Sequence, residues 1–192
     1  MEPVTECPDC LRQAITVDVD ARTSSYSYVY PVNDEKVVKL VREPGALDYL
    51  RMCRAARGAS PHLPVVTDIV TGAVQLFGYQ FSAVRLEKVR SGGTAMEAYA
   101  SDFAWRVREY DDGALTSVLL PATALKCCAQ QWPKPRRSMS SCLLLMADAV
   151  VEHDWVADLA NDDNWMIRER AGAVVRSGPV HSREFVADTP SD

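Results

Sequence analysis

The sequence contains no hydrophobic run that approaches the roughly 18 residues needed to cross a bilayer. It also has no excess of basic residues: 21 Lys and Arg stand against 26 Asp and Glu, which gives a net charge of −5 at pH 7. Proteins that bind the phosphate backbone of nucleic acids normally present a basic face. We therefore expect neither a membrane partner nor direct binding to nucleic acid.

The first six residues are acidic where a signal peptide would be basic and then apolar, so we expect a cytoplasmic protein. Disulfides are not expected among its six cysteines in that reducing compartment. Cys7 and Cys10 form a lone C-x-x-C, and the adjacent Cys127 and Cys128 are poorly spaced to complete a zinc site. The three histidines have no Ser or Cys partner at a recognisable spacing, so no hydrolytic triad is expected. No cofactor is expected either.

The composition is that of a folded globular protein of about one domain, with 47% hydrophobic and 24% charged residues. The first part of the chain has the alternation typical of strands, together with one helical repeat that a glycine ends. Strands are predicted at 15–19, 23–30, 36–41, 65–70, 74–81 and 83–87, and a helix at 46–57. Turns at Pro31–Glu35 and Thr71-Gly72 predict two hairpins.

The rest of the chain is predicted to be mostly helical. A loop is expected at 132–138, because two prolines and three cations do not fit inside a regular element. Helices are predicted at 94–110, 115–131 and 140–153, and short strands at 165–168 and 173–176. The predicted fold class is α+β: a small antiparallel sheet with one helix, followed by a mostly helical part.

Three residues stand where protein kinases keep their catalytic groups. Lys39, in Val37-Val38-Lys39-Leu40, has the place of the strand lysine that pairs with nucleotide phosphates. Asp158 enters a polar loop that ends at Asn164. In kinases this loop supplies an acid that accepts the substrate proton and an asparagine that binds magnesium. The order of the predicted elements resembles that of the protein-kinase fold.

The motifs also support a narrower resemblance. Tyr26-Ser27-Tyr28-Val29-Tyr30 resembles an aromatic strand, Val37-Val38-Lys39 a lysine strand, and Asp158-Leu159 with Asn164-Trp165-Met166 a catalytic loop. Together they resemble the kinase-like early proteins of T7-like bacteriophages, over residues 20–181. The resemblance implies a protein that acts on host machinery, in the cytoplasm of the host cell.

The same resemblance divides the chain into three parts. It implies a kinase-like N-lobe over residues 1–90, a reduced helical C-lobe over 91–182 and a tail over 183–192. Only twelve residues follow Val180. We therefore expect the substrate-binding and activation-loop regions of an ordinary kinase to be missing.

Several positions depart from the kinase pattern. The glycines that close over phosphates are replaced in Arg22-Thr23-Ser24, and Ala160 stands in place of the catalytic-loop histidine. Asp158 and Asn164 are six positions apart where kinases use five. Either the loop carries an insertion, or Asp163 takes the place of the metal ligand.

The second metal carboxylate is missing as well, because Gly178, or Ser177 in a shifted register, stands in its place. Asp48 is the available acidic partner for Lys39, although its position does not match the pattern convincingly. Phosphoryl transfer depends mainly on electrostatic stabilisation, so these losses predict a pseudokinase that binds and inhibits a host protein or protein complex. Candidate targets are the transcription machinery and a defence complex such as CRISPR, and the sequence leaves that choice open.

Two other functions stay open at this point. The first is an active minimal Ser/Thr kinase that uses Lys39, Asp158 and Asn164 with ATP and magnesium. The second is a plain interaction domain whose likeness to kinases is accidental. Phosphorylation of a host protein, lost in Asp158→Ala, separates the first of these from the pseudokinase.

Partner-binding residues are predicted in two segments that the sequence indicates are surface loops. One holds Trp132 with Arg136 and Arg137, and the other holds Asp111 and Asp112. Aromatic residues and arginine dominate the binding energy of many interfaces. The acidic net charge favours a basic partner.

Overall fold

The computed structural model describes residues 27–76, 79–90, 92, 94–110, 119–120, 122–132, 137–158, 165–168, 173–176 and 180–182. Its first part is a four-stranded antiparallel sheet with the strand order β1-β2-β4-β3. The strands are β1 (Ser27–Pro31), β2 (Lys36–Val41), β3 (Val66–Leu76) and β4 (Tyr79–Glu87). Helix α2 (Pro44–Ala55) connects β2 to β3. The predicted strand 15–19 lies outside the described residues.

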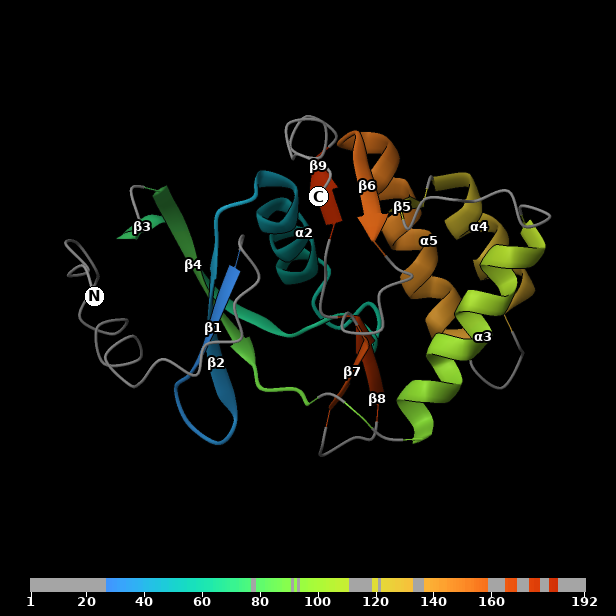
Figure 1. Cartoon of the computed structure of the whole chain (residues 1–192), viewed down its shortest axis with the longest axis horizontal. Helices are drawn as coiled ribbons and strands as arrows, with labels where there is room; N and C mark the ends of the chain where they lie inside the picture. The colour runs from blue at the N-terminus through green and yellow to red at the C-terminus, as the bar shows by residue number, and fades with distance from the viewer. Residues whose placement is uncertain are drawn as a thin grey trace, which may run out of the picture.

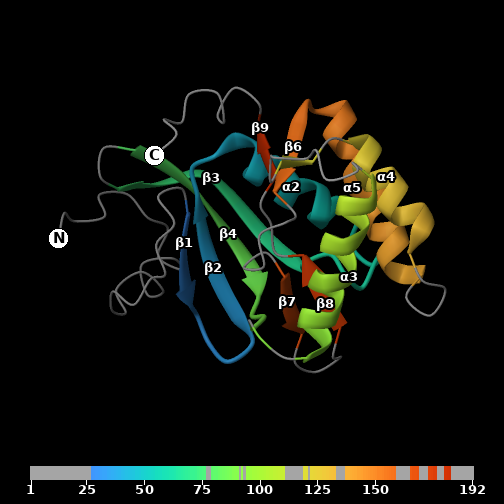
Figure 2. The same cartoon turned by 45° about the vertical axis from the view of Figure 1, so that its right-hand side comes forward.

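Helices and short strands make up the second part of the molecule. The helices are α3 (Thr94–Tyr110), α4 (Ala122–Gln131) and α5 (Arg137–Glu152). Strands β5 (Leu119–Leu120), β6 (Trp155–Asp158) and β9 (Val180–Ser182) form one small sheet, and β7 (Trp165–Arg168) pairs with β8 (Ala173–Arg176). Figures 1 and 2 show the four-stranded sheet on one side of the molecule and helices α3 to α5 on the other. The described part of the chain is therefore α+β, as predicted.

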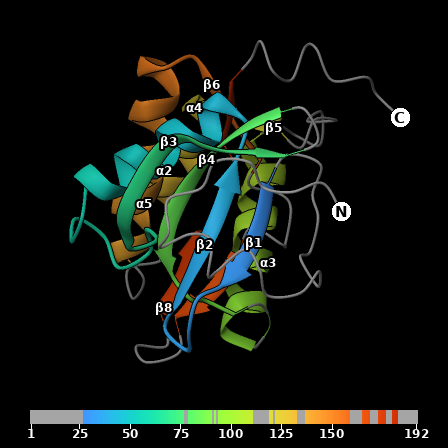
Figure 3. The same cartoon turned by 90° about the vertical axis from the view of Figure 1, so that its left-hand side faces the viewer.

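Strand β2 contributes side chains to both faces of the four-stranded sheet, as alternation along a strand requires. Val38 and Leu40 are fully buried in a cluster with Phe81 on one face. Val37 and Val41 belong to the other cluster, which contains residues of α2 and of the helical part. Figure 3 views the sheet with the helical part behind it. The sheet thus separates two apolar clusters, and its α2-facing side is continuous with the main core.

Helix α2 begins at a capped end. Glu43 is buried, and its carboxylate accepts hydrogen bonds from the backbone N–H groups of Gly45, at 2.9 Å, and of Ala46. These bonds satisfy donors that the first turn of a helix leaves unpaired. Pro44 follows at the first helical position, where its missing N–H costs nothing. The helix buries Tyr49, Leu50 and Cys53 toward the main core. The sequence predicted this helix two residues too late at both ends, at 46–57.

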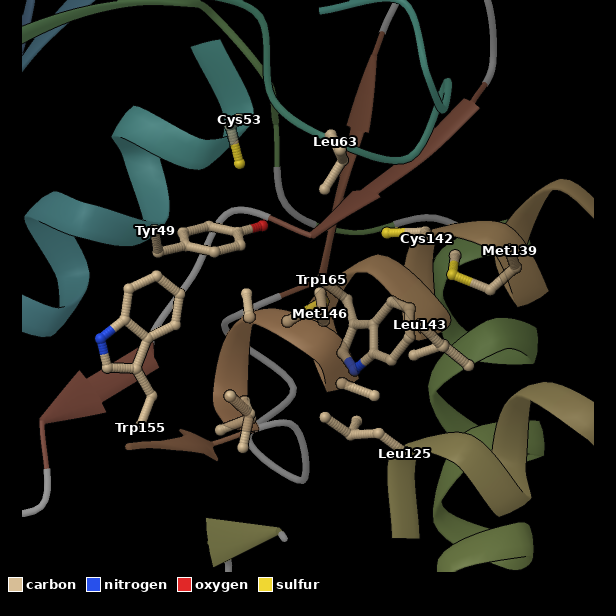
Figure 4. Packing of buried hydrophobic residues seen from close by; sticks show 14 of the residues in the cluster. Tyr49, Cys53, Leu63, Leu125, Met139, Cys142, Leu143, Met146, Trp155 and Trp165 are labelled. Atoms are coloured by element: carbon tan, nitrogen blue, oxygen red, sulfur yellow. The ribbon is translucent and has the colours of Figure 1, made fainter. Parts of the chain in front are cut away.

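Helix α5 supplies the centre of the main core. Met139, Leu143, Met146 and Val150 recur at helical spacing and are at most 4% exposed. Figure 4 shows α5 side chains close to Trp165 of β7, with Tyr49 and Cys53 extending from α2. Each large apolar side chain buried in this way stabilises the fold by about 1.5–3 kcal/mol.

Three further predicted boundaries are wrong. Thr71-Gly72 is not a hairpin turn, because β3 continues through it to Leu76 with a register shift between Val70 and Val74. Gly72 has φ +60° and donates its N–H to Ser82 Oγ at 3.3 Å, so the turn-forming residues are accommodated as an irregularity inside the strand.

The predicted helix 115–131 is also wrong in its first part. Leu119–Leu120 form strand β5, and the helix begins only at Ala122. Pro121 explains the difference, because a proline disfavours helical backbone at the residue before it. The predicted loop 132–138 is shorter than expected as well, since Arg137 already begins α5.

Candidate functional site

Lys39 lies in the middle of β2 on the face of the sheet that α2 covers. It alternates with Val38 and Leu40, which belong to the opposite cluster, and it stands between Val29 of β1 and Val84 of β4. Val84 is fully buried in the main core. The side chain of Lys39 is therefore held among aliphatic neighbours on three strands.

The charge of Lys39 is poorly compensated in the described part of the chain. The side chain is half-buried, and burial lowers the pKa of Lys39 because desolvation disfavours the ammonium form. Asp48, the only acidic residue of α2, forms an ion pair with Arg51 at 2.6 Å, and its side chain is 40% exposed. Among the described residues, no ion pair joins Lys39 to an acid. The prediction that Asp48 pairs with Lys39 is wrong, because i, i+3 spacing gives Asp48 a nearer cation.

Asp158 is the last residue of β6, and its backbone pairs with Leu119 of β5. Asp163 and Asn164 lie outside the described residues, directly before β7 begins at Trp165. The predicted catalytic loop thus spans the connection between two described strands. The roles assigned to Asp158, Asp163 and Asn164 stay predictions, as does an ion pair between Lys39 and a carboxylate of residues 158–163.

Arg168, at the end of β7, joins the helical part to the four-stranded sheet. Its guanidinium donates to both carboxylate oxygens of Glu87, each at 2.6 Å. It also donates to the carbonyl oxygens of Pro61, at 2.8 Å, and Leu63, at 3.1 Å. Hydrogen bonding to Glu87 raises the pKa of Arg168. Because the two side chains are only 20% and 16% exposed, this is a largely desolvated, bidentate pair.

The same carboxylate also orders the loop before β3, because Glu87 accepts a hydrogen bond from the backbone N–H of Val65 at 2.9 Å. A backbone bridge lies next to this ion pair: Arg90, three residues after Glu87, and Ile167, the residue before Arg168, exchange hydrogen bonds of 3.1 and 2.8 Å. Beside this junction is a cavity of about 300 Å³, whose lining includes Arg57, Ser60 and Arg168. Strand β7 is therefore fastened to the sheet by side-chain and backbone bonds together.

His62 forms another connection between the two parts. Its Nδ1 lies 2.6 Å from the carbonyl oxygen of Val174 in β8, and its Nε2 lies 2.8 Å from Ser138 Oγ in α5. A carbonyl can only accept, so Nδ1 carries the proton and the neutral ring accepts at Nε2 from the Ser138 hydroxyl. Desolvation by burial lowers the pKa of His62; the hydrogen bond to Val174 offsets part of this effect, and Arg168 adds a smaller lowering. The neutral form, in which Ser138 donates to Nε2, is thus the favoured one.

Two of the predicted partner-binding residues, Trp132 and Arg137, do not lie in the exposed loop that the sequence predicted. Trp132 is only 5% exposed, and its ring lies 6.0 Å from that of Tyr99 and 6.3 Å from that of Phe103. The prediction that Trp132 lies on an exposed loop is therefore wrong, because aromatic residues of α3 cover it. Arg137 is the first residue of α5, and its side chain is outside the described part.

The other predicted contact residues, Arg136, Asp111 and Asp112, lie outside the described residues. An exposed tryptophan does exist among the described residues, but it is Trp105 of α3, at 53%. The guanidinium of Arg106 lies 5.4 Å from the ring centroids of both Trp105 and Trp132.

The bonds that connect the two parts were missed by the sequence analysis. Glu87 and Arg168 are 81 residues apart, and His62 and Ser138 are 76 apart. No local motif specifies pairs at such separations. The only local signal was Pro61-His62-Leu63-Pro64, where the prolines indicate a loop and the histidine is the polar residue most suited to burial within it.

None of the described helices is both long and apolar enough to cross a membrane. The longest is α3, with 17 residues. What the chain does is therefore inferred from its residues and their geometry: no protein-family model matches the chain, and no curated protein matches it.

Proposed function

We propose that this chain is a kinase-like protein that binds and inhibits a host protein complex without transferring phosphate. The arrangement of the first five elements supports the kinase likeness. Lys39 lies on an inner strand of an antiparallel sheet, and the single helix of that part follows the lysine strand and packs on its lysine-bearing face. A protein kinase places its strand lysine and the helix that supplies its acidic partner in the same relation.

The second part supports the same proposal. A connection of a few residues leads from β4 into α3, and strands β6 and β7 flank residues 159–164. In a kinase the catalytic loop has this place between two short strands. The β7–β8 hairpin and strand β9 then follow, with residues 177–179 between β8 and β9, where a kinase has its metal-binding aspartate. Here that stretch reads Ser-Gly-Pro.

One observation carries the proposal that catalysis is lost: the only acid of α2 pairs with Arg51 and not with Lys39. An active kinase requires the ion pair between strand lysine and helix acid, because it holds the lysine on the nucleotide phosphates. The missing metal carboxylate at 177–179 and the missing glycines at 22–24 act in the same direction. A chain without these groups acts through binding.

The class of partner rests on the resemblance to early proteins of T7-like bacteriophages. Such a protein meets the host's transcription machinery and its defence complexes, such as CRISPR, in the host cytoplasm. The net charge of −5 favours a basic surface on the partner, since charge complementarity accelerates association. An active Ser/Thr kinase using Lys39, Asp158 and Asn164 is the alternative function, and it needs ATP and magnesium.

A binding experiment tests the proposal. The tagged chain is mixed with bacterial lysate, retained proteins are identified, and the main one is purified to measure its affinity for wild type, Lys39→Ala and Asp158→Ala. We expect one host protein to bind all three equally, within about threefold, and to lose activity when bound. An affinity that depends on ATP and on Lys39, or a retained protein that becomes phosphorylated, contradicts the proposal and supports the active kinase.

A further inference from the structure

The pair formed by His62 and Ser138 has the geometry of a nucleophile next to its base. Ser138 lies in the first turn of α5 and is exposed, whereas His62 is only 4% exposed. The distance of 2.8 Å between Ser138 Oγ and His62 Nε2 is that of a direct hydrogen bond. The serine hydroxyl can therefore reach a reagent in solvent while its proton stays in contact with a buried imidazole.

The imidazole is also held in one orientation. The ring Nδ1 donates to the carbonyl oxygen of Val174 at 2.6 Å, and the backbone N–H of His62 donates to Ser60 Oγ at 3.2 Å. Ser60 Oγ in turn donates to the carbonyl oxygen of Ser138 at 3.3 Å. A nucleophile in hydrogen-bond contact with a base, and a base oriented by a third group, are the structural requirements for an activated serine. Here a main-chain carbonyl takes the place of the carboxylate of a Ser-His-Asp triad.

Burial favours the neutral, basic form of the ring, and the hydrogen bond to the Val174 carbonyl opposes this effect in part. Arg168 of β7 is the charged group that acts on the ring, and as a cation it disfavours the imidazolium. Tyr99 of α3 packs against the ring with 5.8 Å between centroids. Val174 of β8 and Ser138 of α5 contribute only uncharged groups. His62 can thus accept a proton at neutral pH, although without a carboxylate behind it the imidazolium is stabilised less than in a triad.

We propose that Ser138 is an activated nucleophile, with His62 as its base, and that it takes an acyl group from small carboxylic esters. Ser138 Oγ forms a bond to the carbonyl carbon while its proton passes to His62 Nε2. The bond from that carbon to the alcohol oxygen breaks, and the leaving alcohol takes the proton back from His62. In the second half, water gives a proton to His62 Nε2 and its oxygen bonds to the acyl carbon; the bond from that carbon to Ser138 Oγ then breaks, and Oγ takes the proton back from His62. This site uses neither Lys39 nor Asp158, so its test is independent of the test of the proposed function.

A fluorophosphonate is the probe of choice, because its phosphorus replaces the ester carbonyl carbon and the adduct is stable. The Oγ–P bond forms, the P–F bond breaks, fluoride leaves and the hydroxyl proton passes to His62. Labelling is followed by peptide mass spectrometry on wild type, Ser138→Ala, His62→Gln and Ser141→Ala. Ser141 is the matched control, an exposed serine on the same helix.

We expect the adduct on Ser138, at least tenfold faster than on Ser141, with no change in Ser141→Ala. His62→Gln should slow the labelling about a hundredfold, the usual contribution of a general base. If circular dichroism shows that His62→Gln does not fold, the wild-type pH profile decides: the labelling rate should fall as pH decreases through a value below 6.5, the ordinary pKa of histidine. Labelling of Ser138 no faster than Ser141, a folded His62→Gln that labels at the wild-type rate, or a flat pH profile would overturn the proposal.

Discussion

Two regions of this protein hold a cation on a strand of a small sheet, and they treat it in opposite ways. Arg168, where the helical part meets the four-stranded sheet, has a bidentate acidic partner and two carbonyl acceptors, and its pKa is raised. Lys39, on the face covered by α2, has no acidic partner among the described residues, and its pKa is lowered. Arg168 therefore contributes its charge to the fold, whereas among the described residues the charge of Lys39 is not paired with an acid.

This difference indicates that the stability of the fold depends on the residues around Arg168 more than on Lys39. At the junction, Arg168 and Glu87 bond each other and His62 bonds Val174 and Ser138, so loss of one member leaves a partner without its hydrogen bond. Trp132, in the helical part, is packed against aromatic residues of α3. Under the proposed function, Lys39 has the position of a kinase lysine and lacks its helix partner. Substitutions should therefore be costly at the junction and harmless at Lys39.

Trp132→Ala should have the largest effect. It removes a side chain that is 5% exposed and packs on Tyr99 and Phe103, so we expect a loss of about 4 kcal/mol in the free energy of unfolding. Chemical denaturation measures it. Trp105→Ala is the control, since that ring is 53% exposed and should cost less than about 1 kcal/mol. Equal costs would place Trp132 at the surface after all.

Arg168→Met should cost about 3 kcal/mol, because it leaves the carboxylate of Glu87 largely buried without its cation. Arg51→Met provides the matched comparison: it breaks an ion pair of equal length, 2.6 Å, whose side chains are 48% and 40% exposed. We expect at most about 0.5 kcal/mol there. If the two variants unfold at the same denaturant concentration, the junction is not the stronger of the two sites.

The junction should also make stability depend on pH. The pKa of His62 is lowered in the folded state, so the unfolded state binds more protons once pH falls below about 6.5, the ordinary histidine value. Stability from this residue is present above that pH and is lost as pH decreases, by at most about 1.4 kcal/mol per unit for one proton. Denaturation between pH 5.5 and 7.5 should show a larger loss for wild type than for His62→Gln, and parallel curves would exclude His62 as the cause.

Lys39→Met should have the smallest effect and the opposite sign. It replaces a half-buried ammonium by an apolar side chain of similar length, so we expect stabilisation by about 1 kcal/mol. Lys88→Met, at an exposed position, should leave the free energy of unfolding unchanged. Destabilisation by Lys39→Met alone would reveal an acidic partner for Lys39, such as a carboxylate of residues 158–163.

Much of the local structure could be predicted, because it depends on neighbours in sequence. Strand β2 and helix α3 were predicted with their observed bounds, and the apolar spacing of α5 predicted its buried face. Thr71-Gly72 was misinterpreted because the same residues suit a turn and a bulge. Only pairing with Ser82 on the neighbouring strand decides between them.

The candidate sites were harder to predict for a related reason. Lys39 could be placed on a strand, but whether Asp48 faces it depends on the rotation of α2 about its axis, which the packing of Tyr49 and Cys53 sets. Trp132 follows a helix and precedes a proline, so its sequence neighbourhood resembles a loop. Its burial comes from Tyr99 and Phe103, about 30 residues away in the chain.

The proposed function requires that this kinase-like protein transfers no phosphate. The most direct measurement incubates the purified chain with radiolabelled ATP, magnesium and bacterial lysate, alongside Lys39→Ala and Asp158→Ala. We expect the same background labelling in all three samples. A host protein labelled strongly by wild type, and not by Asp158→Ala, would contradict it.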